Sequence, residues 1–287
     1  MIGIILTAIS TLTTEIGLSI GKYTIGKKEN RIYALGAISS IGSGIVLLLF
    51  GFFVPKDFFG SGIPGGFVFS AASLPFLVTR IFLDIAQSHI TLLALARTER
   101  SAFGFIRIIT LPLLLLTDLV LGYQIAFVQI CGVAVIIVGL LLLFLNHGIP
   151  KKGAFLTLFT ALNAVVTISL YKYNITHFNS VATEQSIVTW AIVIYFLFLS
   201  FVVAKQNPFK LLRYRRYYMQ FFMGTIDSIT ISFAYLFAPA SVITSAKRAL
   251  SILFAIGAGN FYFGEKHVLL KLTCFVLVAG GVVMLVL

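Results

Sequence analysis

Seven ionisable side chains stand inside long apolar runs of this sequence, where a charge needs a partner. A charge within a lipid bilayer costs roughly 2.5–3.5 kcal/mol even on the scale measured by membrane insertion. Each of these residues therefore requires an opposite charge or a water-filled cavity, and such residues often bind protons, ions or substrates. They are Glu15, Arg80, Asp84, Arg107, Asp227, Lys247 and Arg248.

The four interior bases favour the binding of an anion. Lys247 and Arg248 are adjacent, so their side chains point in different directions on a helix and at least one of them faces the interior. Thr244 and Ser251 lie on the side of Arg248 and add hydroxyl groups. We expect Lys247, Arg248 and Arg107 to hold an anionic group, with Thr244 and Ser251 beside it. The alternative for an arginine near a helix end is that it extends outward to lipid headgroups.

The interior acids allow two roles. Glu15 is a candidate proton carrier, because a buried carboxyl group can bind and release a proton. It can equally pair with an interior base such as Arg107 or Lys247. Arg80 and Asp84 are four residues apart on one helix face, so an ion pair within the helix can neutralise both without any further role.

The elements that position these residues are membrane helices. Of 287 residues 59% are hydrophobic and only 10% are charged, whereas a soluble protein carries about a quarter charged residues. The runs are continuously apolar for roughly 20 residues, which suits a helix that crosses a bilayer and not a barrel strand. We expect an all-α integral membrane protein with ten transmembrane helices. They are placed at 2–21, 32–53, 70–95, 101–121, 124–145, 153–172, 184–204, 216–238, 241–262 and 267–287.

The net charge of +12 comes from bases in the short loops between these runs. One face of the membrane has only Lys56 and Lys172, so the positive-inside rule predicts that the other face is cytoplasmic and that both chain ends lie outside. This distribution argues against a nucleic-acid partner and for the lipid bilayer. The fifteen bases of the cytoplasmic face are Lys22, Lys27, Lys28, Arg31, Arg97, Arg100, Lys151, Lys152, Lys205, Lys210, Arg213, Arg215, Arg216, Lys266 and Lys271.

The residue types of metal sites and hydrolytic enzymes are sparse and scattered. Cys131 and Cys274 lie inside apolar runs, and the four histidines have no zinc-binding spacing. The sequence also has no nucleophile elbow and no ATP-binding motif. We therefore expect no enzymatic activity, no catalytic residues, no metal and no cofactor.

An internal repeat joins the two halves of the chain. The segment 118–124 matches 260–266 in its central glycine, and a terminal apolar helix follows each of them. Because each half then has five helices, an odd number, the two halves enter the membrane from opposite faces as inverted repeats. The predicted repeats cover 1–147 and 151–287.

The repeat makes the interior charges equivalent in pairs. Asp84 corresponds to Asp227, and Arg107 to Arg248, within one residue. A two-fold axis brings one acid and one base from each half toward the middle of the bundle, where carriers built from inverted repeats bind their substrates.

Ten helices in two halves that each end in a short glycine-centred hairpin resemble the drug/metabolite transporter superfamily. The segment 260–266, with Gly264, Glu265 and Lys266, resembles its EamA-type hairpin. In the first copy Tyr123 and Gln124 replace the acid and the base. The resemblance covers the whole chain and implies a multi-pass transporter.

Two shorter resemblances point to different branches of this superfamily. Ser241 and Val242, followed by the Lys247–Arg248 pair, resemble the phosphate-translocator and nucleotide-sugar branches, in which paired bases hold an anionic substrate. Glu15 in the first helix resembles the glutamate of the small multidrug resistance branch, which binds protons and cationic drugs in turn.

Three functions follow from these patterns. The first is a secondary transporter of small metabolites with an anionic group, and the seven interior charges, which sum to +1, favour it. The second is a proton-coupled exporter of cationic or amphipathic drugs centred on Glu15, in which the basic residues only pair with Asp84 and Asp227. The third is a structural or receptor-like membrane protein, which has no need of an inverted repeat. We expect a monomer with a small-molecule substrate, in a prokaryotic cell membrane.

Two further patterns concern helix geometry. Gly36, Ser40 and Gly44 recur every four residues, which predicts close helix packing. Pro112 and Pro239 are expected to bend the fourth helix and the start of the ninth.

Overall fold

A computed structural model describes residues 2–26, 31–53, 66–120, 126–147, 151–237, 240–263 and 268–286. All regular elements within these ranges are helical. The central parts of the two hairpins, with Gly122 and Gly264, and Pro239 lie outside the described residues. The all-α prediction is therefore confirmed for the part of the chain that the structure covers.

The helices follow the apolar runs of the sequence. In order they are α1 (Ile2–Ile25), α2 (Arg31–Phe53), η1 (Ala71–Ser73), α3 (Leu74–Arg97), α4 (Arg100–Ile106), η2 (Arg107–Ile109), α5 (Thr110–Val120), α6 (Phe127–His147), α7 (Lys151–His177), α8 (Val181–Val202), α9 (Pro208–Leu211), α10 (Arg215–Phe237), α11 (Ala240–Phe263) and α12 (Val268–Val286).

Five of these helical segments are long and apolar enough to cross a membrane. Large hydrophobic side chains cover the outside of the bundle, including Phe52, Phe82 and Val276, each of which is more than 60% exposed. Such a surface is stable in lipid and not in water. The protein is therefore a membrane-embedded, multi-pass protein. The five segments are Ile2–Ile25, Arg31–Phe53, Ala71–Arg97, Gly153–His177 and Val181–Val202.

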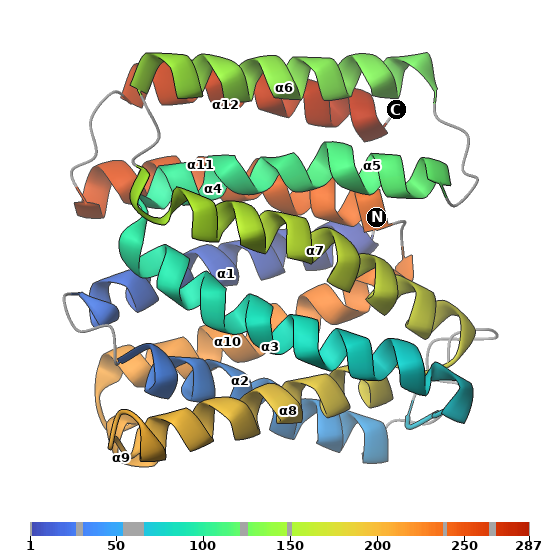
Figure 1. Cartoon of the computed structure of the whole chain (residues 1–287), viewed down its shortest axis with the longest axis vertical. Helices are drawn as coiled ribbons and strands as arrows, with labels where there is room; N and C mark the ends of the chain where they lie inside the picture. Colours follow the sequence, from blue (N-terminus) through green and yellow to red (C-terminus); the bar gives the residue numbers. More distant parts are fainter. Residues whose placement is uncertain are drawn as a thin grey trace.

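The bundle is built from pairs of helices that are distant in the sequence (Figure 1). Helix α1 packs along α10, and α3 packs along α7. The pair α6 and α12 forms one edge of the bundle, and the pair α2 and α8 lies at the other. Helix α11 contacts both α1 and α4, so it lies in the middle.

The two ends of the bundle differ in charge. At one end α1, α3 and α8 end and α2, α7 and α10 begin (Figure 1). We call this the basic end, and the other, where α1 begins and α12 ends, the opposite end. Bases whose side chains the structure describes at the basic end include Lys22, Arg31, Arg97, Lys205, Lys210, Arg213, Arg215 and Arg216.

The fourth predicted helix, 101–121, is broken in the middle. Helix α4 ends at Ile106, a 3₁₀ turn follows over Arg107–Ile109, and α5 begins at Thr110. Pro112 explains the break, because proline has no N–H to donate to the carbonyl four residues earlier and its ring collides with that carbonyl. The expected bend at Pro112 is thus present, one turn before the proline itself.

Two other helices differ from the predicted boundaries. The sixth, expected to end at residue 172, continues to His177, so Lys172 lies within α7 and donates a 2.7 Å hydrogen bond from Nζ to the carbonyl of Tyr235. The seventh begins at Val181, before the predicted residue 184, because the side chain of Ser180 caps its first turn by accepting a hydrogen bond from the Thr183 amide.

Candidate functional site

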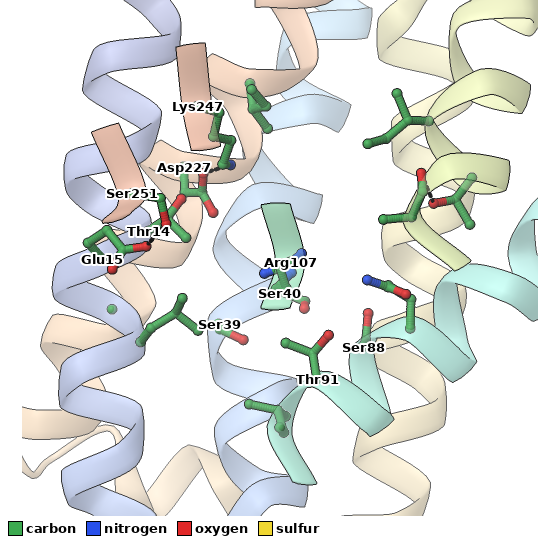
Figure 2. A pocket seen from close by; sticks show the side chains of 18 of the residues that line it. Thr14, Glu15, Ser39, Ser40, Ser88, Thr91, Arg107, Asp227, Lys247 and Ser251 are labelled. Carbon is green, nitrogen blue, oxygen red and sulfur yellow. Dashed lines mark hydrogen bonds and ion pairs between the residues drawn. The ribbon is translucent and has the colours of Figure 1, made fainter. Parts of the chain in front are cut away.

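A cavity of about 380 Å³ lies among helices of both halves of the chain (Figure 2). Side chains from α1, α2, α3, η2, α7, α8, α10 and α11 line it. The residues from α1, α2 and α3 come from the parts of those helices nearer the basic end. The residues from α10 and α11 include Tyr235 and Thr244, which lie near the ends of those helices at the opposite end, so the cavity spans the middle of the bundle.

Five of the seven predicted interior charges line this one cavity. Glu15, Arg107, Asp227, Lys247 and Arg248 reach it from four different elements. With three bases against two acids, their formal charges sum to +1. The predicted hydroxyl partners join them, because both Thr244 and Ser251 line the cavity.

Lys247 is held by an acid from the neighbouring helix α10. Its Nζ lies 3.0 Å from Oδ1 of Asp227 and donates a second hydrogen bond, also 3.0 Å, to Oγ of Ser10. The Ser10 hydroxyl donates in turn to the same Asp227 oxygen at 2.5 Å. The side chains of Lys247 and Asp227 are 18% and 24% exposed, so this pair faces the cavity and a ligand can reach it.

Glu15 and Arg248 lie deeper in the wall of the cavity, 3% and 7% exposed respectively. The hydroxyl of Ser251 donates a 2.5 Å hydrogen bond to Oε1 of Glu15. Among the described residues, Nε of Arg248 is buried without a hydrogen-bond partner, which leaves a donor available on a side chain that lines the cavity.

Arg107 reaches the cavity from the break between α4 and α5. Its guanidinium group lies 5.2 Å from the centre of the Phe103 ring, a cation–π arrangement. Figure 2 shows Arg107 in the middle of the view, between the charged wall that carries Glu15, Asp227 and Lys247 and the helices across from it.

A hydroxyl-rich surface completes the cavity. Ser88 and Thr91 of α3 lie across from the charged wall in Figure 2, and the amide side chains of Gln87 and Gln220 also line the cavity. These residues could not be identified from the sequence, because a single hydroxyl or amide side chain in an apolar run does not form a recognisable pattern. Ser40 was expected to serve helix packing only, but its side chain also lines the cavity. The packing contact itself lies at Gly36, against the ring of Phe196.

Arg80 and Asp84 do not line the cavity. Their ion pair within the helix is present, with Nε of Arg80 3.0 Å from Oδ2 of Asp84. Arg80 also bonds Glu184 of α8, with 3.0 Å between Nη1 and Oε1. Glu184, a fully buried acid, was not among the predicted interior charges, because residue 184 was expected to be the first residue of the seventh helix.

The arrangement suits reversible binding of an anion. The cavity has a net positive charge and hydroxyl and amide groups to bind the rest of a polar molecule. No group of three or more His, Cys, Asp or Glu side chains suited to a metal ion occurs in the described ranges. Comparison with known proteins adds no family: no family model matches the sequence, and no curated protein matches it significantly.

Proposed function

We propose that this protein is a secondary transporter of small metabolites that carry an anionic group, working by alternating access through the central cavity. The observation that carries the proposal is the meeting of Lys247, Arg248 and Arg107 on one cavity deep in a membrane-embedded bundle. Three bases are costly there unless anions compensate them, and two acids compensate only in part.

The packing of the helices supports two inverted five-helix repeats. If 1–147 and 151–287 are equivalent, α1 corresponds to α7 and α3 corresponds to α10. The contact of α1 with α10 then has a counterpart in the contact of α7 with α3, and both are present. The pairs α2 with α8 and α6 with α12 each join equivalent helices, as a two-fold axis requires. We propose ten spans on this basis, as in the drug/metabolite transporter superfamily and its EamA-type members.

The remaining expectations form part of the same proposal. We expect no enzymatic activity, a monomer in a prokaryotic cell membrane, and the basic end in the cytoplasm.

A proton-coupled exporter of cationic or amphipathic compounds is the second candidate. The observation that favours it is the location of Glu15, an acid that lines the cavity and accepts a hydrogen bond from Ser251. The two candidates differ in the sign of the charge on the substrate, so a ligand screen separates them.

The experiment begins with thermal unfolding of the purified protein in detergent. Sugar phosphates, nucleotides, amino acids and quaternary amines are added one at a time, because a ligand of the folded state raises the melting temperature. Anionic ligands that stabilise the protein support the first candidate, and stabilisation by quaternary amines alone contradicts it.

Arg248→Lys then tests the site itself. A lysine keeps the charge but lacks the planar fork that binds a carboxylate or phosphate through two hydrogen bonds, so we expect the affinity for the best anion to fall about tenfold or more. The matched control is Arg216→Lys, outside the cavity at the start of α10, which we expect to leave the affinity unchanged. Equal affinity in the wild type and in a folded Arg248→Lys variant contradicts the proposed site.

A further inference from the structure

The proposed transport site leaves one cluster of buried charges without a role. Arg80 joins Asp84 of its own helix and Glu184 of α8 through the two 3.0 Å contacts described above, and Gln185 accepts a further hydrogen bond from Nη2 of Arg80. Arg80 is 4% exposed and Glu184 is completely buried. Charges in a membrane protein are expensive to bury, and a purely structural contact is made more cheaply by apolar side chains.

Two amides connect the cluster to other parts of the bundle. Asn174 of α7 donates to Oε1 of Glu184 at 2.8 Å, and Asn179 donates to Oε2 at 2.7 Å. Asn179 also donates to Oγ of Ser73 at 2.9 Å and accepts from the amide of Ser70 at 3.0 Å. The cluster thus links the start of α3 to α7, to α8 and to the turn between α7 and α8.

On the helices that the cluster shares with the cavity, the cluster lies nearer the opposite end of the bundle. On α3 the cavity is lined by 87–92 and the cluster uses Arg80 and Asp84, nearer the start of the helix. On α7 the lining residues are 164–168, whereas Asn174 lies nearer the helix end. On both helices the cluster lies farther from the basic end than the cavity lining does.

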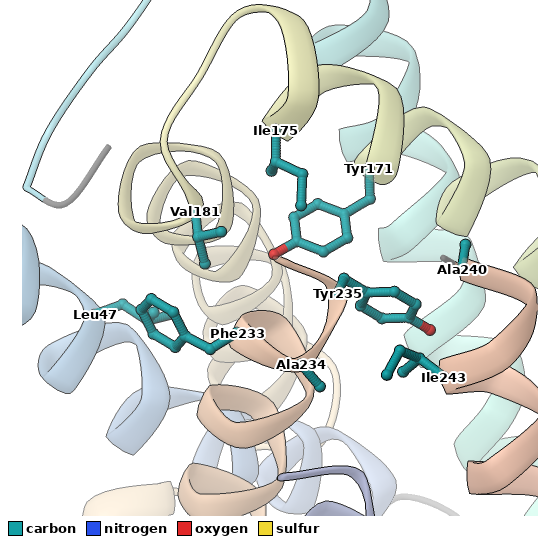
Figure 3. Packing of buried hydrophobic residues seen from close by; sticks show 9 residues of the cluster. All are labelled: Leu47, Tyr171, Ile175, Val181, Phe233, Ala234, Tyr235, Ala240 and Ile243. Atoms are coloured by element: carbon teal, nitrogen blue, oxygen red, sulfur yellow. The ribbon is translucent and has the colours of Figure 1, made fainter. Parts of the chain in front are cut away.

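Two tyrosines, whose neighbouring rings are drawn in Figure 3, connect the cluster to the cavity. Tyr235 lines the cavity, and its ring meets that of Tyr171 edge to face, with 5.7 Å between the centres. The guanidinium group of Arg80 lies 4.3 Å from the centre of the Tyr171 ring. The Tyr171 hydroxyl donates to the carbonyl of Ser232 at 2.9 Å, and Gln185 donates to the Ser232 hydroxyl at 2.7 Å. A continuous chain of contacts therefore runs from the cavity to the ion pairs.

We propose that Arg80, Asp84, Glu184, Asn174 and Asn179 form a gate that closes the cavity toward the opposite end of the bundle. The proposal rests on the proposed transport function. The gate joins α3 of the first half to α7 and α8 of the second half. These helices must separate if the cavity is to open at the opposite end. Ion pairs suit this task because water solvates the separated charges in the open state, whereas they hold each other when water is excluded.

The first experiment measures access to the cavity and needs no substrate. In a background with Cys131→Ser and Cys274→Ala, Thr91→Cys serves as a reporter in the cavity wall. A membrane-impermeant maleimide is applied from either side to vesicles of known orientation. We expect labelling from the basic end, and almost none from the opposite end. Adding Glu184→Gln should speed labelling from the opposite end at least fivefold, because the neutral amide no longer holds Arg80.

The matched control is Glu99→Gln, an exposed acid just before α4, which should leave both labelling rates unchanged. Asp84→Asn provides a second test in which Glu184 still holds Arg80, and it should raise labelling from the opposite end less than Glu184→Gln does. If labelling from that end is the same in all three folded variants as in the reporter protein, the cluster is a structural ion pair and the gate is refuted.

A reversible lock tests the same gate during transport. In the background that lacks Cys131 and Cys274, cysteines replace Ser73 and Asn179, whose side chains are in contact. Because Asn179 belongs to the gate, the reference is the reduced form of the same variant. Oxidation should abolish the exchange of the best anion that the reduced form shows in reconstituted vesicles, while binding in detergent persists, and a reductant should restore that exchange. Normal exchange by the oxidised protein refutes the gate. Absence of exchange in the reduced and wild-type proteins refutes the transport function instead, and the labelling result decides the gate independently.

Discussion

Single hydroxyl groups accompany the charges of the cavity. Ser251 donates to Glu15, and Ser10 lies between Lys247 and Asp227, accepting from the first and donating to the second. A hydroxyl group cannot neutralise a charge, but it fixes the direction in which a carboxylate or an ammonium group points. These serines therefore position the charged groups that we propose to meet the substrate.

Variants of Glu15 distinguish coupling to protons from binding of the substrate. If Glu15 carries protons, Glu15→Asp should keep uptake driven by a pH gradient with an altered pH dependence, and Glu15→Gln should abolish gradient-driven uptake while exchange of one substrate molecule for another continues. The measurement is flux into vesicles with and without an imposed pH gradient. Gradient-driven flux in Glu15→Gln equal to that of the wild type would remove Glu15 as the coupling residue.

At the scale of residues, the sequence predicted which side chains matter better than how they pair. A charge in an apolar run is visible without any structure, and five such residues share the cavity. The i to i+4 spacing also predicted the contact of Arg80 with Asp84. The pair of Lys247 with Asp227 depends on how α10 lies against α11, and no local spacing encodes it. Glu184 was not recognised as an interior charge for a simpler reason, because α8 begins about one turn earlier than expected.

Among the helices, the break before Pro112 has the clearest link to the site. A continuous helix over 101–121 would carry the side chain of Arg107 in a direction set by regular α geometry. The 3₁₀ turn changes that direction, and Thr110 stabilises it by donating to the carbonyl of Arg107 at 2.7 Å. The hydroxyl of Thr110 also lies 3.3 Å from the carbonyl of Ala161, which anchors the break on α7.

Two adjacent glycines of α12 provide a test of helix packing with an internal control. A methyl group at Gly281 would come 2.7 Å from the carbonyl oxygen of Gly132 in α6, which is too close, whereas one at Gly280 would meet nothing within 4 Å. We expect Gly281→Ala to lower the free energy of unfolding by about 1–3 kcal/mol, since overpacking forces the helices apart. Gly280→Ala should be neutral or slightly stabilising.

The readout is the melting temperature of each variant in detergent. Equal melting temperatures for Gly281→Ala and Gly280→Ala would show that α6 and α12 do not pack as closely as described.

Most helices could be predicted from the sequence, because a continuous apolar run leaves few alternatives once water is excluded. Their ends were less predictable. Caps such as Ser180 extend a helix beyond its apolar stretch, and the polar loop before α10 contains the short helix α9, capped by Asn207, which no apolar pattern announces.

On the scale of the whole molecule, the distribution of bases predicts the orientation in the membrane. Position 210, in the loop between α8 and α10, should be reached by an impermeant thiol reagent only from the cytoplasmic side. Lys210→Cys in a background without Cys131 and Cys274 provides the measurement in intact cells. A cysteine added after Leu287 is the complementary probe and should react from outside. Labelling of position 210 from outside would reverse the proposed orientation.

On the proposed function, the bases of the basic end also affect how fast an anionic substrate arrives from that side. Among the described bases of the basic end are Lys22, Arg31, Arg97 and Arg216, and their combined field concentrates anions there before an anion reaches the cavity. The range of this field is set by dissolved salt, about 8 Å at physiological ionic strength and longer in dilute solution. Capture of an anion from the basic end should therefore slow as salt rises, while capture from the opposite end depends on salt much less. If the protein transports as proposed, this uneven charge would make the two directions of transport kinetically unequal.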